Sequence, residues 1–196
     1  MKDIQQYRQA EYEVDPMFIN RWSPRSFTDQ PVPDDVLFSL LEAARWAPSG
    51  SNVQPWRFII ARSEEDRKRF NSFIAPGNRI WCEKAPVLVF ILSRTLNNRD
   101  EPLASHAFDA GAAWGFLALQ ALKKGLITHA MAGFSAEQAR RELKVPKEYD
   151  LHAVIAIGFQ GEKEQLPEAY QEREVPSDRR PLSESVFEGR FGQTIG

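Results

Sequence analysis

The chain has 196 residues, of which 42% are hydrophobic, 27% charged and 11% aromatic. This composition is typical of one globular domain, and it excludes disorder along the whole chain. With 25 Lys and Arg against 27 Asp and Glu, the formal net charge is −2, so no overall positive field is available to hold a nucleic acid.

Residue types also argue against metal and membrane proteins. The single cysteine, Cys82, excludes an intrachain disulfide and a multi-cysteine metal site, and the three histidines share no metal-ligand spacing. The N-terminal residues are polar, and no apolar stretch approaches the roughly 20 residues that span a bilayer. We therefore expect a cytoplasmic protein with no metal, no membrane contact and no nucleic acid partner.

Helices and strands alternate along the first 160 residues. Hydrophobic spacing predicts, in chain order, a helix at 34–46, a strand at 57–61, a charged helix at 64–73, a strand at 87–92, a long helix at 105–124, a strand at 127–132, a helix at 136–143 and a strand at 153–158. Asp34 is a candidate N-cap of the first helix, Pro48 follows its end, and Gly125 is a candidate C-cap of the long helix. The pattern predicts an α/β or α+β domain with few strands.

The composition and the hydrophobic pattern of the chain change at about residue 162. From there to the C-terminus it is charged, interrupted by prolines and without a sustained hydrophobic period. It is either a frayed tail or an arm that packs on another subunit. The arm would be anchored by Leu182, Val186, Phe187 and Phe191.

The segment 21–25 carries a candidate anion site. Pro24 favours an extended backbone at Ser23, and alternate residues of an extended segment point to the same side. Arg21, Ser23 and Arg25 would then converge, and two guanidinium groups with a hydroxyl suit a phosphate. A surface turn with solvated arginines is the alternative.

A polar loop follows the first predicted helix. Residues 47–56 contain Ser, Asn and Gln side chains that donate and accept hydrogen bonds, and Gly50 allows close approach of a ligand to the backbone. Loops held between rigid elements commonly carry binding sites. An ordinary turn-rich connection is the alternative.

These segments together resemble the FMN-dependent nitroreductase family. The resemblance rests on R-x-S-x-R at 21–25 and A-P-S-x-x-N-x-Q-P-W at 47–56, and it extends from about residue 18 to the C-terminus. The further matches are Ala85-Pro86-Val87, Phe108 to Ala113, Gly125-Leu126, His129 to Phe134, Val145-Pro146, Ile155 to Gly158 and Arg179 to Leu182.

The resemblance implies an α+β fold: a three-layer sandwich whose central sheet, mostly antiparallel or mixed, is flanked by helices. It also implies an obligate homodimer with two FMN molecules at the interface. Residues 1–161 would form the FMN-binding core, and residues 162–196 would form a C-terminal arm that wraps the partner subunit.

By the same resemblance, the chain would contact the cofactor in several places. Arg21 and Ser23, with Trp22 between them, would lie at the flavin phosphate, as would Arg179 with the adjacent Arg180. Arg25 would lie near the pyrimidine end of the ring, and the backbone of Ala132 and Gly133 would face the flavin N5 edge. A loop with Pro48, Ser49, Gly50 and Asn52 would reach the flavin of the partner subunit.

The implied activity is that of an NAD(P)H-dependent FMN oxidoreductase. Reducing equivalents would pass from NADH or NADPH through flavin to nitroaromatics, quinones or similar small oxidants in a ping-pong cycle. No catalytic side chain is needed, because the flavin carries the chemistry. The alternatives are a non-catalytic FMN-binding or storage protein, and a specialised branch of the fold such as a dehalogenase or flavin-fragmenting enzyme.

Three further residues attract attention. Cys82 is expected to be a buried small hydrophobe, although it aligns closest to the flavin among residues 78–82. His129 is expected to be structural rather than a proton donor. Asp109 lies within an apolar helix, so we expect it to bind backbone or an arginine at the dimer interface.

Overall fold

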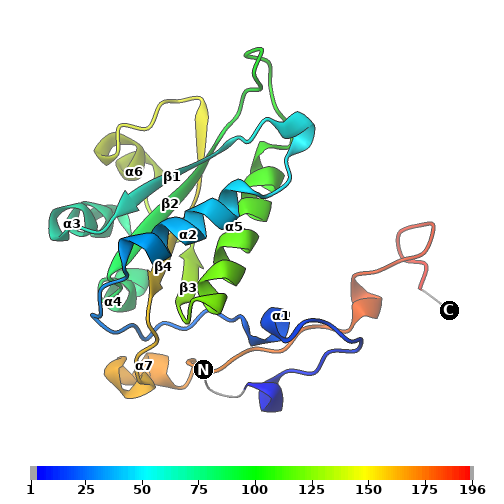
Figure 1. Ribbon diagram of the computed structural model, residues 1–196, viewed down its shortest axis with the longest axis horizontal. Coiled ribbons are helices and arrows are strands. Elements are labelled where there is room, and N and C mark those ends of the chain that lie inside the picture. The colour runs from blue at the N-terminus through cyan, green and yellow to red at the C-terminus, as the bar shows by residue number, and fades with distance from the viewer. Residues whose placement is uncertain (1–3, 195–196) are drawn as a thin grey trace.

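A four-stranded sheet forms the centre of the computed structural model, which describes residues 4–194 (Figure 1). Every neighbouring pair is antiparallel, so the antiparallel form of the expected sheet is the one found. The strands, in the spatial order β1-β2-β4-β3, are β1 (Trp56–Ala61), β2 (Val87–Arg94), β4 (Tyr149–Gly158) and β3 (Ile127–Met131).

Helices cover both faces of the sheet, which makes the expected three layers. On one face, α2 (Asp34–Arg45) and α5 (His106–Lys123) pack against Val89 and Ile91 of β2. On the other face, the residues of α3 (Glu64–Phe73), α4 (Pro76–Cys82) and α6 (Ala136–Glu142) pack against strand residues such as Phe90. The strands therefore have apolar side chains on both faces, as expected for a sheet that helices cover on both faces.

Local signals explain most of the boundaries. Ser63 caps α3 by accepting a hydrogen bond from the backbone N–H of Asp66. After α5, Gly125 has φ +74°, and the N–H of Leu126 bonds the carbonyl of Ala121, as in a Schellman motif. The prediction for Asp34 is wrong: Pro33 occupies the N-cap, and Asp34 is the first helical residue.

Several short elements were not predicted from the sequence. They are α1 (Pro16–Asn20), α4, α7 (Glu168–Gln171) and the 3₁₀ turns η1 (Gln5–Tyr7), η2 (Gly50–Asn52), η3 (Lys163–Gln165) and η4 (Leu182–Glu184). Apart from α4, these elements have three to five residues, too few for a hydrophobic period to appear.

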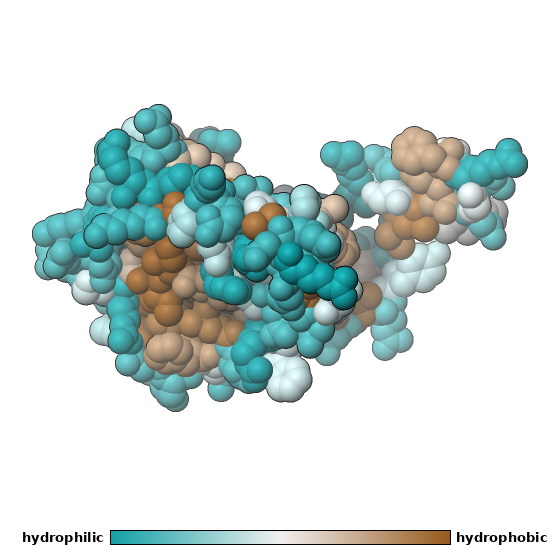
Figure 2. Space-filling view, turned by 90° about the horizontal axis from the view of Figure 1, so that it is seen from above, coloured by the Kyte–Doolittle hydropathy of each residue, from teal (hydrophilic) through white to brown (hydrophobic). Residues whose placement is uncertain are grey.

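The C-terminal region consists of two parts. Residues 162–178 pack on their own chain: Leu166 is buried in the core, and the Tyr170 hydroxyl donates to the carbonyl of Gly77 at 2.9 Å. Beyond Leu182 the chain projects away from the body and carries apolar side chains, among them Phe191, which is 95% exposed (Figures 1 and 2). Packing thus continues past the expected boundary at residue 161, and the projecting part begins near Leu182.

Within residues 4–194, no helix combines the length and apolarity of a membrane span. The same residues contain no group of three or more His, Cys, Asp or Glu side chains arranged to hold a metal ion.

Candidate functional site

A groove rich in arginine lies between the segment that follows α1 and the C-terminal segment. Its volume is about 320 Å³, within the range of small-molecule sites. None of the described residues that line it is acidic. The lining residues of this arginine groove are Arg8, Arg21, Trp22, Ser23, Arg25, His129, Arg173, Val175, Ser177 and Arg179.

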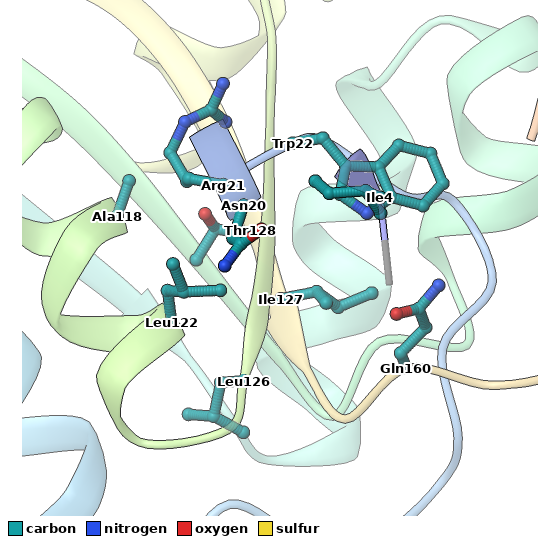
Figure 3. Close-up of a pocket in the computed structure, with 10 residues that line it drawn as sticks. All are labelled: Ile4, Asn20, Arg21, Trp22, Ala118, Leu122, Leu126, Ile127, Thr128 and Gln160. Carbon is teal, nitrogen blue, oxygen red and sulfur yellow. The ribbon is translucent and has the colours of Figure 1, made fainter. Parts of the chain in front are cut away.

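The groove brings together the residues of the 21–25 segment that alternation predicted to share a side. Arg21, Ser23 and Arg25 all line it, and Arg21 Nη1 lies 3.4 Å from the Ser23 hydroxyl. Arg21 and Trp22 point in different directions, and both also border a small cavity against the end of α5 and the start of β3 (Figure 3). The segment is therefore anchored on the sandwich.

The positive charges in the groove are crowded. Burial, followed by the charge of Arg179, lowers the pKa of Arg21, and the pKa of Arg8 is lowered by burial and by Arg179 and Arg21. Among residues 4–194, no carboxylate lies within ion-pair distance of the Arg21 guanidinium. A bound anion would relieve this repulsion, so the residues present suit a phosphate group.

Arg8 connects the two sides of the groove through hydrogen bonds. Its Nη1 donates to the carbonyls of Ile19 and Arg21 at 2.7 and 2.8 Å, and its Nε donates to the carbonyl of Ser177 at 2.7 Å. Sequence reasoning missed Arg8, Arg173 and Ser177, because nothing in their local sequence shows that they reach this groove.

His129 forms the floor of the groove at β3. Its Nδ1 lies 3.0 Å from the carbonyl oxygen of Pro24, and its ring centroid is 4.5 Å from that of Trp81. Burial above all, together with the charges of Arg25 and Arg21 and against the backbone hydrogen bonds, lowers the pKa of His129 to about 4. The imidazole is therefore neutral at pH 7.

The segment after β3 lies against α4. A Cβ built on Gly133 would meet Asn78 Nδ2 at 2.5 Å, and Asn78 Nδ2 donates to the carbonyl of Gly133 at 3.4 Å. Asn78 is thus a residue of α4 that lies against Gly133, whereas Cys82 is fully buried in the core. The expected position of Cys82 nearest the flavin stays a prediction.

The polar loop lies at the opposite end of α5. The backbone N–H of Gly50 donates to Asp109 Oδ2 at 3.2 Å, and the Ser105 hydroxyl donates to the same oxygen at 3.0 Å. Asp109 therefore binds backbone, one of the two roles expected for it. The arginine groove is near the other end of this helix, roughly 20 Å away along its axis.

One chain consequently does not bring all the predicted site residues together. Arg21, Trp22, Ser23, Arg25 and Arg179 share the arginine groove. Pro48, Ser49, Gly50 and Asn52 lie on the distant loop, and Arg180 lines a different hollow with Tyr12 and Phe18.

A Ser–His cluster that the sequence did not reveal lies near the start of α5. Ser93 Oγ is 2.7 Å from His106 Nδ1 and 2.6 Å from His152 Nε2, and His106 Nε2 is 3.8 Å from Asp150 Oδ2. Ser93 is 0% exposed, so its hydroxyl is out of reach of a substrate. The cluster joins β2, β4 and α5 and is not a nucleophilic site.

Comparison with known proteins adds to this geometry. Residues 19–80 match the model of the nitroreductase family. The chain is 30% identical over 168 residues to a putative NADH dehydrogenase/NAD(P)H nitroreductase of Streptomyces coelicolor, an alignment that covers 75% of this chain and 85% of the relative. It is 28% identical over 201 residues to an NADH dehydrogenase of Thermus thermophilus, covering 86% and 92% of the two chains.

A solved structure agrees over nearly the whole length. It is the crystal structure of an oxidoreductase containing FMN, with a TM-score of 0.91 and 44% sequence identity, covering 95% of this chain and 97% of that one. Together, the sandwich, the shared segments and these similarities lead to one conclusion: the chain belongs to the nitroreductase family.

Proposed function

We propose that this protein is an FMN-dependent oxidoreductase that transfers reducing equivalents from NADH or NADPH to small oxidants such as nitroaromatics or quinones. The donor and the oxidant would use the site in turn, as in a ping-pong cycle. The observation that carries the proposal is the arginine groove, which has no acidic residue among its described lining residues and lies in a chain 44% identical to an FMN-containing oxidoreductase.

The groove residues suit the phosphate of FMN. Arg21 and Arg179 are close enough for their charges to repel, and Ser23 adds a hydroxyl beside them. Charge-assisted hydrogen bonds from guanidinium groups contribute roughly 1.5–3 kcal/mol each, so this pair would dominate phosphate binding. Arg25, on the same side of the groove, is proposed to face the ring.

The chemistry that FMN supplies when bound is two-electron exchange between a nicotinamide and a small oxidant. The chain's own part is to bind and orient. Gly133 and Ala132 would offer backbone rather than side chains to the ring edge, and neutral His129 would support the floor without carrying a charge.

A homodimer is part of this proposal. The loop with Pro48, Ser49, Gly50 and Asn52 cannot reach the groove of its own chain, so the partner's loop would complete each site. An apolar stripe of α5 supports an interface, since Phe108 is 82% and Phe116 42% exposed. The projecting segment from Leu182 onward would then pack on the partner subunit. We also propose that the protein is cytoplasmic.

The test is spectroscopic. The purified protein should be yellow, or should become so when FMN is added, and anaerobic NADH or NADPH should bleach the flavin band. A colourless protein that ignores added FMN would overturn the proposal. Bound FMN that neither donor reduces would favour the FMN-storage alternative or a specialised branch of the fold.

Light scattering tests the assembly separately. The FMN-loaded protein should have the mass of two chains, and Phe108→Lys should shift it toward one chain and weaken FMN binding. A stable FMN-loaded monomer would contradict the shared site.

A further inference from the structure

Glu174 is a buried carboxylate just behind the arginine groove. It is 8% exposed, and its Oε1 accepts hydrogen bonds from the backbone N–H groups of Arg25 and Ser26 at 2.7 and 2.9 Å. Its Oε2 is buried without a hydrogen-bond partner among the described residues. Because a buried charge is costly unless it is paired, this second oxygen calls for a physical explanation.

The nearest positive charge to Oε2 belongs to Arg25. Oε2 lies 3.9 Å from Arg25 Nη1, and the same Nη1 lies 3.5 Å from the carbonyl oxygen of Arg173, which precedes Glu174. The guanidinium of Arg25 is therefore held between two acceptors of the C-terminal segment. Arg21, four residues earlier, forms no ion pair with a carboxylate of residues 4–194.

The two arginines thus differ in effective charge. Arg21 presents an uncompensated charge to the groove, whereas the charge of Arg25 is partly offset from behind by Glu174. The compensation acts in a partly buried region, where charges interact more strongly than in bulk water.

We propose that Glu174 is a positioning residue that holds Arg25 at the flavin ring and offsets part of its charge, thereby setting the reduction potential of the bound cofactor. This assignment rests on the proposed function. A negative charge behind Arg25 disfavours the more electron-rich, reduced form of the cofactor. Removing that charge should raise the potential.

A matched pair of variants separates positioning from charge. Glu174→Gln keeps an oxygen that can accept the two backbone N–H bonds but removes the charge. Glu172→Gln removes the same charge from an exposed residue two positions earlier in the same segment. Glu174→Ala removes both the acceptor and the charge.

The experiment uses FMN as the probe and three measurements: the potential of bound FMN by dye equilibration, the affinity of the apoprotein for oxidised FMN by fluorescence, and the melting temperature of the apoprotein. Glu174→Gln should increase the affinity for reduced relative to oxidised FMN by roughly three- to tenfold, with a melting temperature close to wild type. Glu172→Gln should match wild type in all three. Glu174→Ala should also lower the melting temperature and weaken binding of oxidised FMN.

Two outcomes would overturn the assignment. If Glu174→Gln lowers only the melting temperature, or changes the potential no more than Glu172→Gln does, Glu174 is merely structural. A wild-type protein that binds no FMN would overturn the proposed function and this assignment with it. The first result leaves the proposed function intact, so the two failures are distinguishable.

Discussion

The Nδ1 atom of His129 lies 3.0 Å from the carbonyl oxygen of Pro24, and this contact joins strand β3 to the segment that carries four groove residues. The contact also settles the protonation of the ring. Nδ1 must carry the proton to donate to a carbonyl, so the neutral imidazole keeps Nε2 as an acceptor.

This contact predicts a loss of stability in acid. Burial lowers the pKa of His129 to about 4 from the ordinary value of 6.5, so the unfolded chain takes up a proton first as the pH falls. The contribution of neutral His129 is fully present above pH 6.5 and is lost toward pH 4, by roughly 3 kcal/mol in total. Urea unfolding at pH 7.5, 6 and 5 measures this loss in the free energy of unfolding. His129→Gln should flatten the dependence, and an unchanged slope would contradict the prediction.

Asp109 should stabilise the distant loop. Asp109→Ala leaves the Gly50 N–H and the Ser105 hydroxyl without their acceptor, which is expected to lower the free energy of unfolding by about 1–3 kcal/mol. Asp109→Asn keeps an oxygen and should cost less. The exposed Asp29→Ala is the control and should stay near wild type in urea unfolding. Equal effects of all three variants would refute the role.

Gly133 and Asn78 should be energetically coupled. Gly133→Ala places a methyl group 2.5 Å from Asn78 Nδ2, so overpacking should destabilise the protein by about 1–3 kcal/mol. Asn78→Ala opens this space, and the double variant should recover much of the loss. A double-mutant cycle by urea unfolding measures the coupling. Additive effects would show that Asn78 is not the obstacle.

Cys82 should be unreactive in the folded protein. Burial, with a smaller effect of the Glu83 charge, raises its pKa to about 12, so very little thiolate exists at pH 8. A disulfide reagent such as DTNB should label the thiol slowly in buffer and rapidly in denaturant. Complete labelling of the native protein within minutes would contradict the buried position.

Arg21 should distinguish FMN from riboflavin, which lacks the phosphate. Losing one charge-assisted bond of roughly 1.5–3 kcal/mol should weaken FMN binding about ten- to a hundredfold in Arg21→Gln. Riboflavin affinity should not change. Fluorescence titration measures both, with the exposed Arg99→Gln as control. Equal losses for the two ligands would place Arg21 away from the phosphate.

Much of the secondary structure could be predicted from local sequence. Helix α3 appears within its predicted bounds because Ser63 caps it and acidic residues occupy its first turn. Helix α5 ends where Gly125 permits a positive φ. The four-strand order was out of reach, since β2 pairs with β4 across more than 50 intervening residues and no local pattern records such a pairing.

In the candidate site, too, some features could be predicted from local sequence and others could not. Alternation along an extended backbone was enough to place Arg21, Ser23 and Arg25 on one side, because that geometry depends only on neighbouring residues. Tertiary structure alone decided that Arg8 and Glu174 would hold this segment, through contacts with backbone far away in the chain. It also decided that the polar loop lies at the other end of α5. Such contacts depend on how distant segments pack, which residue type and spacing do not encode locally.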